Sequence, residues 1–395
     1  MINRIKIKNF RSLDVDVKLE PVTVLVGRSG TGKSNFVDAI RFLRDRLLRP
    51  DEKIKADKIK PILSDKDSLL EYEISFDVSQ LAGSFTYLVK FNFNDHRLDI
   101  GLNNIYTQEE KLSFNDETLF YFDGKKCIVQ PPIPQNNTHV RSLALAEING
   151  IQKISIAHIA LSEGIGCYDF PGNVCCPSVS QNDKKENTAS NDIHSGLLDG
   201  GENINTIFGK IWHDLTRLES WNRINDSMRF VNDSIQVIDQ KLERSGEIIV
   251  THRFGDRSFF LDLSRESEGC RRFFAHMLAF HQTPPKQTMI FEEPERGLYP
   301  AAFAVLADEM KICHQAGQGQ VILTTHSPDL LNSFEPESLR VVIMENGITR
   351  IGSIAPDQMQ SVKDSLMTTG ELLTVDDARI DTPHTSQVNL EGQTA

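Results

Sequence analysis

The chain has 395 residues, of which 39% are hydrophobic and 25% charged, as expected of a globular protein with one large domain or two. Its net charge of −12 argues against a surface that binds nucleic acid everywhere, and no apolar run approaches the length of a membrane span. The start of the chain lacks the features of a signal peptide, and six scattered cysteines show no zinc-site spacing. We therefore expect a cytoplasmic protein with reduced cysteines and no membrane contact.

The first predicted elements are strands that lead into a glycine-rich loop. Ile5 and Ile7 alternate with lysines, and residues 21–26 form a short apolar run typical of a buried strand. Apolar residues then recur on one helical face until Pro50, so the loop joins a strand to a helix N-terminus, where the helix dipole favours an anion. The loop has the pattern G-x-x-x-x-G-K-[ST] and reads Gly27-Arg28-Ser29-Gly30-Thr31-Gly32-Lys33-Ser34.

This loop predicts a nucleotide site. Its glycines let the backbone wrap around a phosphate with the N–H groups pointing inward. The Lys33 ammonium suits the β- and γ-phosphates, and the Ser34 hydroxyl suits Mg²⁺. A glycine-rich turn with a chance lysine is the alternative, and the flanking strand and helix favour nucleotide binding over it.

The middle of the chain changes character several times. Basic residues at 41–60 are interleaved with acids, which favours a solvated face and leaves a local nucleic-acid patch as the alternative. Between residues 70 and 129 apolar residues recur with period two, and Asp123-Gly124 predicts a hairpin turn, so this section is predicted to be an antiparallel sheet. Residues 177–203 are polar and predict a surface or disordered loop, whereas helical periodicity runs from 207 to about 242.

A second motif follows far downstream, where apolar residues 288–291 end in Glu292 and Glu293. This is the Walker B pattern: a buried parallel strand delivers its acids to the edge of the sheet at which the phosphate loop also lies. Glu292 suits a Mg²⁺ ligand acting through the water shell of the ion, and Glu293 suits the base that polarises the attacking water. An acidic strand end at a surface turn is the alternative.

Two further patterns accompany the paired glutamates. An apolar strand at 321–325 ends at His326, whose imidazole can hydrogen-bond a γ-phosphate or the attacking water. A helix N-cap is predicted at Ser267, and Gly269 permits close approach to an anion. Taken alone, these are a structural histidine and an ordinary capped helix.

In this order, the loop, the capped helix, the Glu-Glu-Pro-Glu strand and the Thr-His-Ser strand resemble the ABC-type ATPases of the SMC, RecF and OLD group. The opening at 7–13 looks like the start of these proteins. Segments 198–204 and 370–373 look like the compact AAA-type ATPases found in bacterial phage-defence loci. The resemblance covers most of residues 1–50 and 197–375.

The resemblance implies an α/β fold: an ABC-type P-loop ATPase head with a mixed central sheet, an antiparallel β section and a helical insertion. Long coiled-coil heptads are absent, and the tail is too short for the nuclease domain of OLD proteins. We expect five parts in chain order: the N-terminal part of the head with the phosphate loop (1–50), the antiparallel β section (51–135), a helical or irregular insertion with a disordered loop near 177–203 (136–245), the C-terminal part of the head (246–374) and a flexible tail (375–395).

Proteins of this group hold ATP between two heads. The resemblance therefore implies that Ser267, Glu268 and Gly269 contact the γ-phosphate bound by the second copy, so that ATP holds a homodimer together. Within one copy, Glu293 and His326 would be catalytic, while Ser34 and Glu292 would hold the metal. The remaining nucleotide contacts are expected from Arg11, Gly27, Arg28, Ser29, Gly30, Thr31, Gly32, Lys33, Ser34 and Asn35.

Some positions depart from the pattern of the group. Glu292 stands where many relatives have Asp, Cys270 where Gln or Thr is usual, and Tyr299 where His is common before proline. None of these changes removes a catalytic charge. Glu295 and Leu298 would lie in the segment that crosses between the two sites of a dimer.

We therefore expect an ATPase that uses ATP and Mg²⁺ and switches between clamped and open dimers. It would act on DNA or control a separately encoded effector such as a nuclease, in phage defence or DNA maintenance. The alternative is the nucleotide-binding subunit of an ABC transporter. A small-molecule kinase is a third possibility, but it leaves Glu292, Glu293 and His326 unexplained.

Overall fold

The computed structural model describes residues 1–50, 62–63, 69–92, 105–130, 143–176, 196–241 and 247–381. Within these ranges the strands form one 13-stranded mixed sheet and one three-stranded sheet. In spatial order the large sheet contains β8 (Cys127–Val129), β7 (Glu117–Phe122), β6 (Tyr106–Phe114), β5 (Ser84–Asn92), β4 (Leu70–Asp77), β1 (Ile2–Phe10), β2 (Leu13–Lys18), β16 (Ile348–Ser353), β15 (Leu339–Glu345), β3 (Val22–Val26), β14 (Gln320–Thr324), β13 (Thr288–Glu292) and β9 (Ile165–Tyr168).

One end of this sheet is parallel and buried on both faces. The strands β15, β3, β14, β13 and β9 pair in parallel, so their carboxyl ends meet at one edge. Alternate residues of each strand belong to different cores: Leu25 packs into one hydrophobic cluster, and Val24 and Val26 pack into the other. Continuous apolar runs are therefore required here, as the sequence of β3 predicts.

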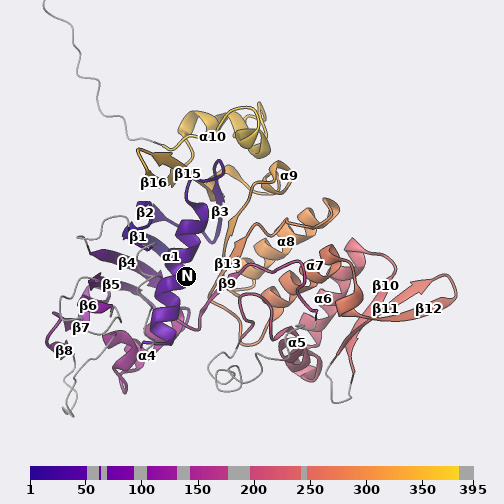
Figure 1. Ribbon diagram of the computed structural model, residues 1–395, viewed down its shortest axis with the longest axis horizontal. Helices are drawn as coiled ribbons and strands as arrows, with labels where there is room; N and C mark the ends of the chain where they lie inside the picture. The colour runs from indigo at the N-terminus through magenta and orange to yellow at the C-terminus, as the bar shows by residue number, and fades with distance from the viewer. Residues whose placement is uncertain are drawn as a thin grey trace, which may run out of the picture.

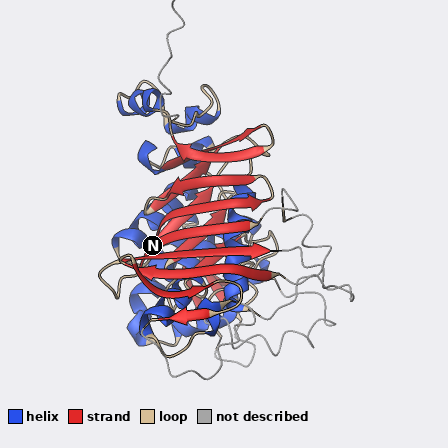
Figure 2. Cartoon of the chain, turned by 90° about the vertical axis from the view of Figure 1, so that its left-hand side faces the viewer, coloured by secondary structure: helices blue, strands red, loops and turns tan. Residues whose placement is uncertain are grey.

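The other end of the sheet is antiparallel. Strands β4 to β8 pair in sequence with antiparallel register, which confirms the predicted period-two section. The turn after β7 contains Gly124 at φ 84°, and the Asp123 carboxylate accepts the N–H groups of Lys125 and Lys126. This confirms the predicted hairpin. Figure 2 shows the strands on this side of the sheet stacked one beside another, with helices behind them.

Helices cover both faces of the large sheet. On one face α1 (Lys33–Leu48) contacts β1 as well as β9 and β13, so it packs against the middle of the sheet and its parallel end. It is accompanied there by α3 (Ala144–Glu147) and α4 (Gln152–Leu161). The other face packs against α5 (Ile204–Trp212), α6 (Leu218–Val231), α7 (Glu268–His281), α8 (Ala301–Gln315) and α9 (Pro328–Leu331). Helix α10 (Pro356–Lys363) lies above β15 and β16 in Figure 1.

The small sheet consists of β10 (Ile235–Gln240), β11 (Ile248–Phe254) and β12 (Arg257–Asp262). It extends to one side of the molecule beside α6 (Figure 1). Because β10 interrupts the region of predicted helical periodicity that runs to about residue 242, that expectation is wrong after Val231, where α6 ends.

Three sequence-based expectations differ from the structure. The predicted disordered loop falls partly outside the described residues, but residues 196–203 are ordered: Leu197 donates its N–H to Gln282, and Leu198 to Asn203. The start of the predicted flexible tail is also ordered, since Ile380 forms a bridge with Ile354. Finally, β9 pairs with β13 in the main sheet, so the expected insertion at 136–245 contributes a strand to the head.

Candidate nucleotide site

The phosphate loop leaves the carboxyl end of β3 and enters α1. Gly27, Gly30 and Gly32 have φ values of 156°, 79° and 104°, which side chains rarely adopt. A Cβ on Gly32 would also collide with the side chain of Thr349, whose hydroxyl donates to the Thr31 carbonyl at 2.9 Å. The loop shape therefore depends on these glycines and is anchored by β16.

The buried Lys33 side chain is held by the loop itself. Its Nζ donates to the carbonyl oxygens of Gly27 at 2.7 Å and Arg28 at 3.0 Å. Burial lowers the pKa of Lys33 to about 8, and the Glu293 carboxylate partly opposes that shift. Because no side chain in the described part of the chain caps α1, the N–H groups of its first turn remain available to an anion.

Beside the loop, hydrogen bonds link two of the expected nucleotide contacts, Arg11 and Asn35. Ser34 lies exposed in the first turn of α1. The Asn35 amide donates to the Ser12 hydroxyl at 2.9 Å and accepts from Arg11 at 3.0 Å. Arg11 also donates to Asp38 at 2.6 Å. Arg11 and Asn35 thus lie together beside the loop but are paired with each other.

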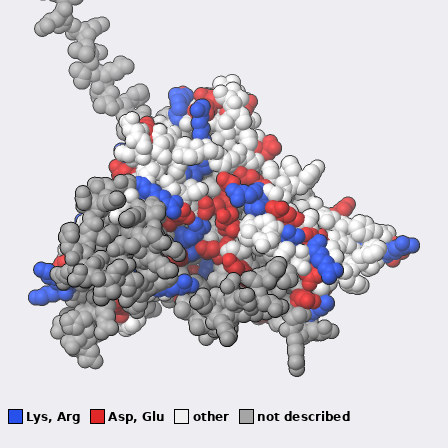
Figure 3. Space-filling model, in the orientation of Figure 1, with Lys and Arg blue, Asp and Glu red and all other residues white. Residues whose placement is uncertain are grey.

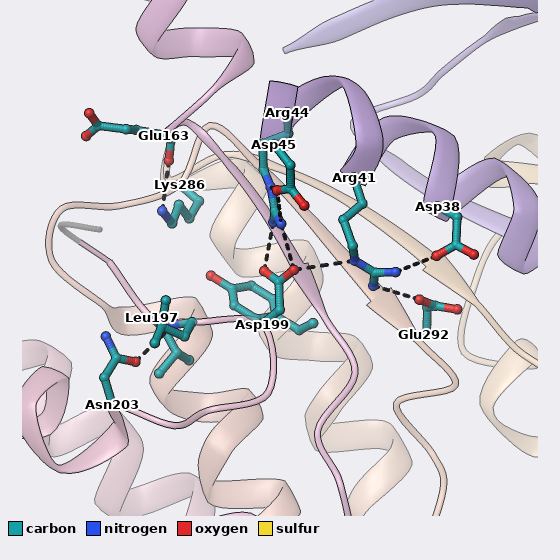
Figure 4. Close-up of polar contacts among 12 residues, drawn as sticks. Asp38, Arg41, Arg44, Asp45, Glu163, Leu197, Asp199, Asn203, Lys286 and Glu292 are labelled. Atoms are coloured by element: carbon teal, nitrogen blue, oxygen red, sulfur yellow. Dashed lines mark hydrogen bonds and ion pairs between the residues drawn. The ribbon is translucent and has the colours of Figure 1, made fainter. Parts of the chain in front are cut away.

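The first Walker B glutamate ends β13 and faces an arginine. Glu292 accepts a hydrogen bond from Arg41 of α1 at 2.8 Å. Arg41 also donates to Asp38 at 2.6 Å, and its Nε lies 3.4 Å from the Asp199 carboxylate (Figure 4). Burial raises the pKa of the Glu292 carboxyl, and the Arg41 guanidinium opposes this shift.

Sequence reasoning missed this arginine cluster. Arg44, one helical turn beyond Arg41, donates to both carboxylate oxygens of Asp199 at 2.7 Å (Figure 4). The expected solvated face is thus wrong for Arg44, whose side chain is only 9% exposed, while residues 51–60 lie outside the described residues. Two sequence features could have indicated this cluster. Arg41 and Arg44 are spaced to lie on one helix face, and segment 198–204 contains the acidic residue Asp199.

The two predicted catalytic residues lie together. Glu293 adopts φ 43°, and its N–H donates to the carbonyl of Thr324 at 3.1 Å, so the chain turns sharply at the end of β13. Its carboxylate pairs with Arg296 and lies 3.7 Å from Nε2 of His326. Burial and the nearby Lys33 ammonium lower the pKa of His326, which favours the neutral imidazole.

The segment Ser267–Gly269, called here the signature segment, is held from behind. Ser267 caps α7 by accepting the N–H of Cys270 at 3.3 Å, and the exposed Glu268 pairs with Arg272 at 3.5 Å. A Cβ on Gly269 would lie 2.7 Å from the carbonyl oxygen of Gly297, so the helix start packs closely against the segment after β13. Among the described residues no hydrogen bond joins the signature segment to residues 27–35.

The donors present fit a magnesium ion bound together with a nucleotide. Mg²⁺ in such sites takes one or two protein oxygens and completes its shell with phosphate oxygens and water. The exposed Ser34 hydroxyl and the Glu292 carboxylate are oxygen donors of this kind. In the described part of the chain, no group of three or more His, Cys, Asp or Glu side chains could hold a metal by itself.

Comparisons with known proteins identify ATPase domains in two parts of the chain. Residues 1–121 match the family model described as AAA ATPase domain, and residues 211–332 match the one described as AAA domain, putative AbiEii toxin, Type IV TA system. The Old nuclease of Escherichia phage P2 is 22% identical over 382 residues, covering 83% of this chain and 57% of the relative. The chain therefore spans less than two thirds of that protein.

Solved structures show the same fold. A crystal structure of an SMC head bound to the C-winged helix domain of ScpA matches with a TM-score of 0.55 at 14% identity, covering 90% of this chain and 99% of that one. The SMC head domain from Thermotoga maritima matches more loosely, with a TM-score of 0.47 at 15% identity over 89% of this chain and 98% of that one. None of the described helices is long and apolar enough to cross a membrane.

Proposed function

We propose that two copies of this ATPase close head to head around ATP. The proposal starts from the matched ATPase domains and from the similarity of the chain to SMC and OLD proteins. One observation carries the proposal. Lys33, Glu293 and His326 are grouped at one site, whereas the signature segment has an exposed glutamate and, among the bonds of the described residues, no hydrogen bond to the phosphate loop. A second copy would supply that segment to the nucleotide.

The arrangement supports hydrolysis by direct attack of water. Lys33 would exchange the carbonyls of Gly27 and Arg28 for phosphate oxygens, while the free N–H groups of α1 receive the remaining charge. Glu293 would accept the proton of the attacking water, and His326 would orient the γ-phosphate. Bound Mg²⁺, held through Ser34 and Glu292, would neutralise part of the phosphate charge.

The Glu293→Gln variant tests the dimer. It keeps the shape of the base but removes its proton acceptor, so ATP should accumulate in the closed state. We expect light scattering after gel filtration to give a dimer mass with ATP and a monomer mass with ADP. A monomer under both conditions would contradict the head-to-head closure.

For the biological role, we propose that the ATP switch controls DNA engagement or a separate effector such as a nuclease, in the cytoplasm. The support is the likeness to a phage protein named a nuclease and to an SMC head bound to a partner protein. ATP-loaded Glu293→Gln protein should retain the effector or DNA on purification, and Lys33→Ala protein should not. Equal recovery with both variants would refute ATP control.

A further inference from the structure

The third glutamate of the Glu-Glu-Pro-Glu segment has no role in the scheme above, yet it contacts the catalytic histidine. Glu295 lies in the turn after β13. Its Oε1 accepts the hydroxyl of Thr325 at 2.7 Å and the backbone N–H of His326 at 2.9 Å. One carboxylate oxygen thus holds two consecutive residues at the end of the neighbouring strand, β14.

These bonds begin where the sheet ends. The β13–β14 ladder stops at the pair Glu292 and Thr324. Beyond it the backbone N–H of His326 meets the Glu295 side chain in place of a strand partner. Thr325 is fully buried and its hydroxyl also accepts the N–H of Ser327, so a shift of Glu295 would reach the whole segment 325–327.

The other oxygen of Glu295 makes this arrangement costly. Within the described residues Oε2 is buried and has no hydrogen-bond partner. A buried carboxylate oxygen without a donor destabilises a fold. A carboxylate kept in such a place, beside a catalytic group, calls for a functional reason.

We propose that Glu295 is a positioning residue for ATP hydrolysis, which fixes the backbone at His326 so that the imidazole stays beside Glu293. The inference rests on the role proposed above for His326. Glu295 itself need not touch the nucleotide. Its effect is on the geometry of the reacting centre, where a displacement of about 1 Å lowers the rate by roughly 100-fold.

The test compares Glu295→Ala with Glu295→Gln. The alanine variant removes the acceptor of both bonds, and we expect kcat to fall by about 100-fold while the Kd for ATP changes by less than about threefold. The glutamine variant keeps an Oε1 acceptor and should recover kcat to within about threefold of the wild type. Equal losses in both variants would overturn the proposal, as would wild-type kcat in Glu295→Ala.

Asp214→Ala is a matched control. The Asp214 carboxylate also receives one backbone N–H and one hydroxyl, both from Thr216, but at an exposed turn before α6. It should leave kcat unchanged. Melting curves of each variant exclude unfolding, and Thr325→Val, which removes only one of the two donors, should give a smaller loss than Glu295→Ala.

A double variant separates this inference from the proposed role of the histidine. If Glu295 acts through His326, adding Glu295→Ala to His326→Ala should lower kcat no further. A wild-type rate in His326→Ala would refute the role of the histidine itself. A slow His326→Ala combined with full additivity in the double variant would overturn only the positioning by Glu295.

Discussion

The phosphate loop and the signature segment differ in how the rest of the chain contacts them. Several contacts within the chain fix the loop, whereas the contacts described for the signature segment come from α7 and the segment after β13. Around the loop, Thr349 anchors the backbone and Gly27 and Arg28 hold the Lys33 ammonium. At the signature segment, Ser267 is used as a helix cap and Glu268 is exposed. The contacts expected around the phosphates are thus assembled within a single chain, while the signature segment exposes Glu268 to solvent.

The largest effect on nucleotide binding is expected from Lys33→Ala, which removes the ammonium group of the phosphate loop. The Kd for ATP should rise by about 100-fold or more, because hydrogen bonds from a charged donor to the phosphates are lost. Titration with a fluorescent ATP analogue measures this, with the exposed Lys18→Ala as control. An unchanged affinity for ATP would contradict nucleotide binding at the phosphate loop.

Glu293→Gln should spare binding and stop hydrolysis. Because the amide cannot accept the proton of water, kcat should fall by about 10²–10⁴-fold while ATP still binds. Phosphate release under single-turnover conditions gives the rate. If the variant hydrolyses ATP at the wild-type rate, the base lies elsewhere.

Ser267→Arg tests whether the signature segment takes part in closure of the dimer. An arginine side chain at this surface should block closure, so ATPase activity falls by about tenfold or more while the Kd of the monomer changes less than about threefold. The activity should also lose its dependence on protein concentration. Normal ATPase activity in this variant would refute the head-to-head closure and would mean that one chain forms the whole site.

The pH dependence of binding sharpens the contrast further. Since burial lowers the pKa of Lys33 to about 8, the free protein loses this cation as pH rises through about 8. The bound phosphate requires the protonated form, so the Kd for ATP should rise above that pH by up to about tenfold per unit. Calorimetry between about pH 7 and pH 9.5 measures it, and Lys33→Arg should bind more weakly but without this dependence. A flat profile for the wild type would contradict the burial of Lys33.

The smallest effect is expected from Asp199→Ala, at the joint between α1 and the segment that leads to α5. Arg44 would lose a bidentate partner at a side chain only 9% exposed, and the free energy of unfolding should fall by about 1–3 kcal/mol. The exposed pair of Asp14 and Arg350 is the control, for which Asp14→Ala should cost about 0–1 kcal/mol. Urea denaturation compares the two variants. Equal losses in the free energy of unfolding would mean that Arg44 and Asp199 form an ordinary surface pair.

How much the sequence could predict depended on the range of the interactions. The phosphate loop, β3 and the end of β13 follow from local patterns, and the parallel topology then brings Glu293 near Lys33. The strand β9 has only four residues and is in the sheet because it pairs with β13, which lies more than a hundred residues away. Arg41 and Asp199 meet for the same reason, since no local rule links a helix to a polar segment far along the chain.

The contact between Gly269 and Gly297 has a consequence for how the two hydrolysis centres of a dimer would influence each other. Two backbones meet there without a side chain between them, so the signature segment and the segment behind Glu293 form one seam within a chain. In a closed pair, movement at one hydrolysis centre would therefore displace the signature segment that contacts the ATP of the other copy. The two hydrolysis centres of such a pair would then be mechanically coupled through each chain.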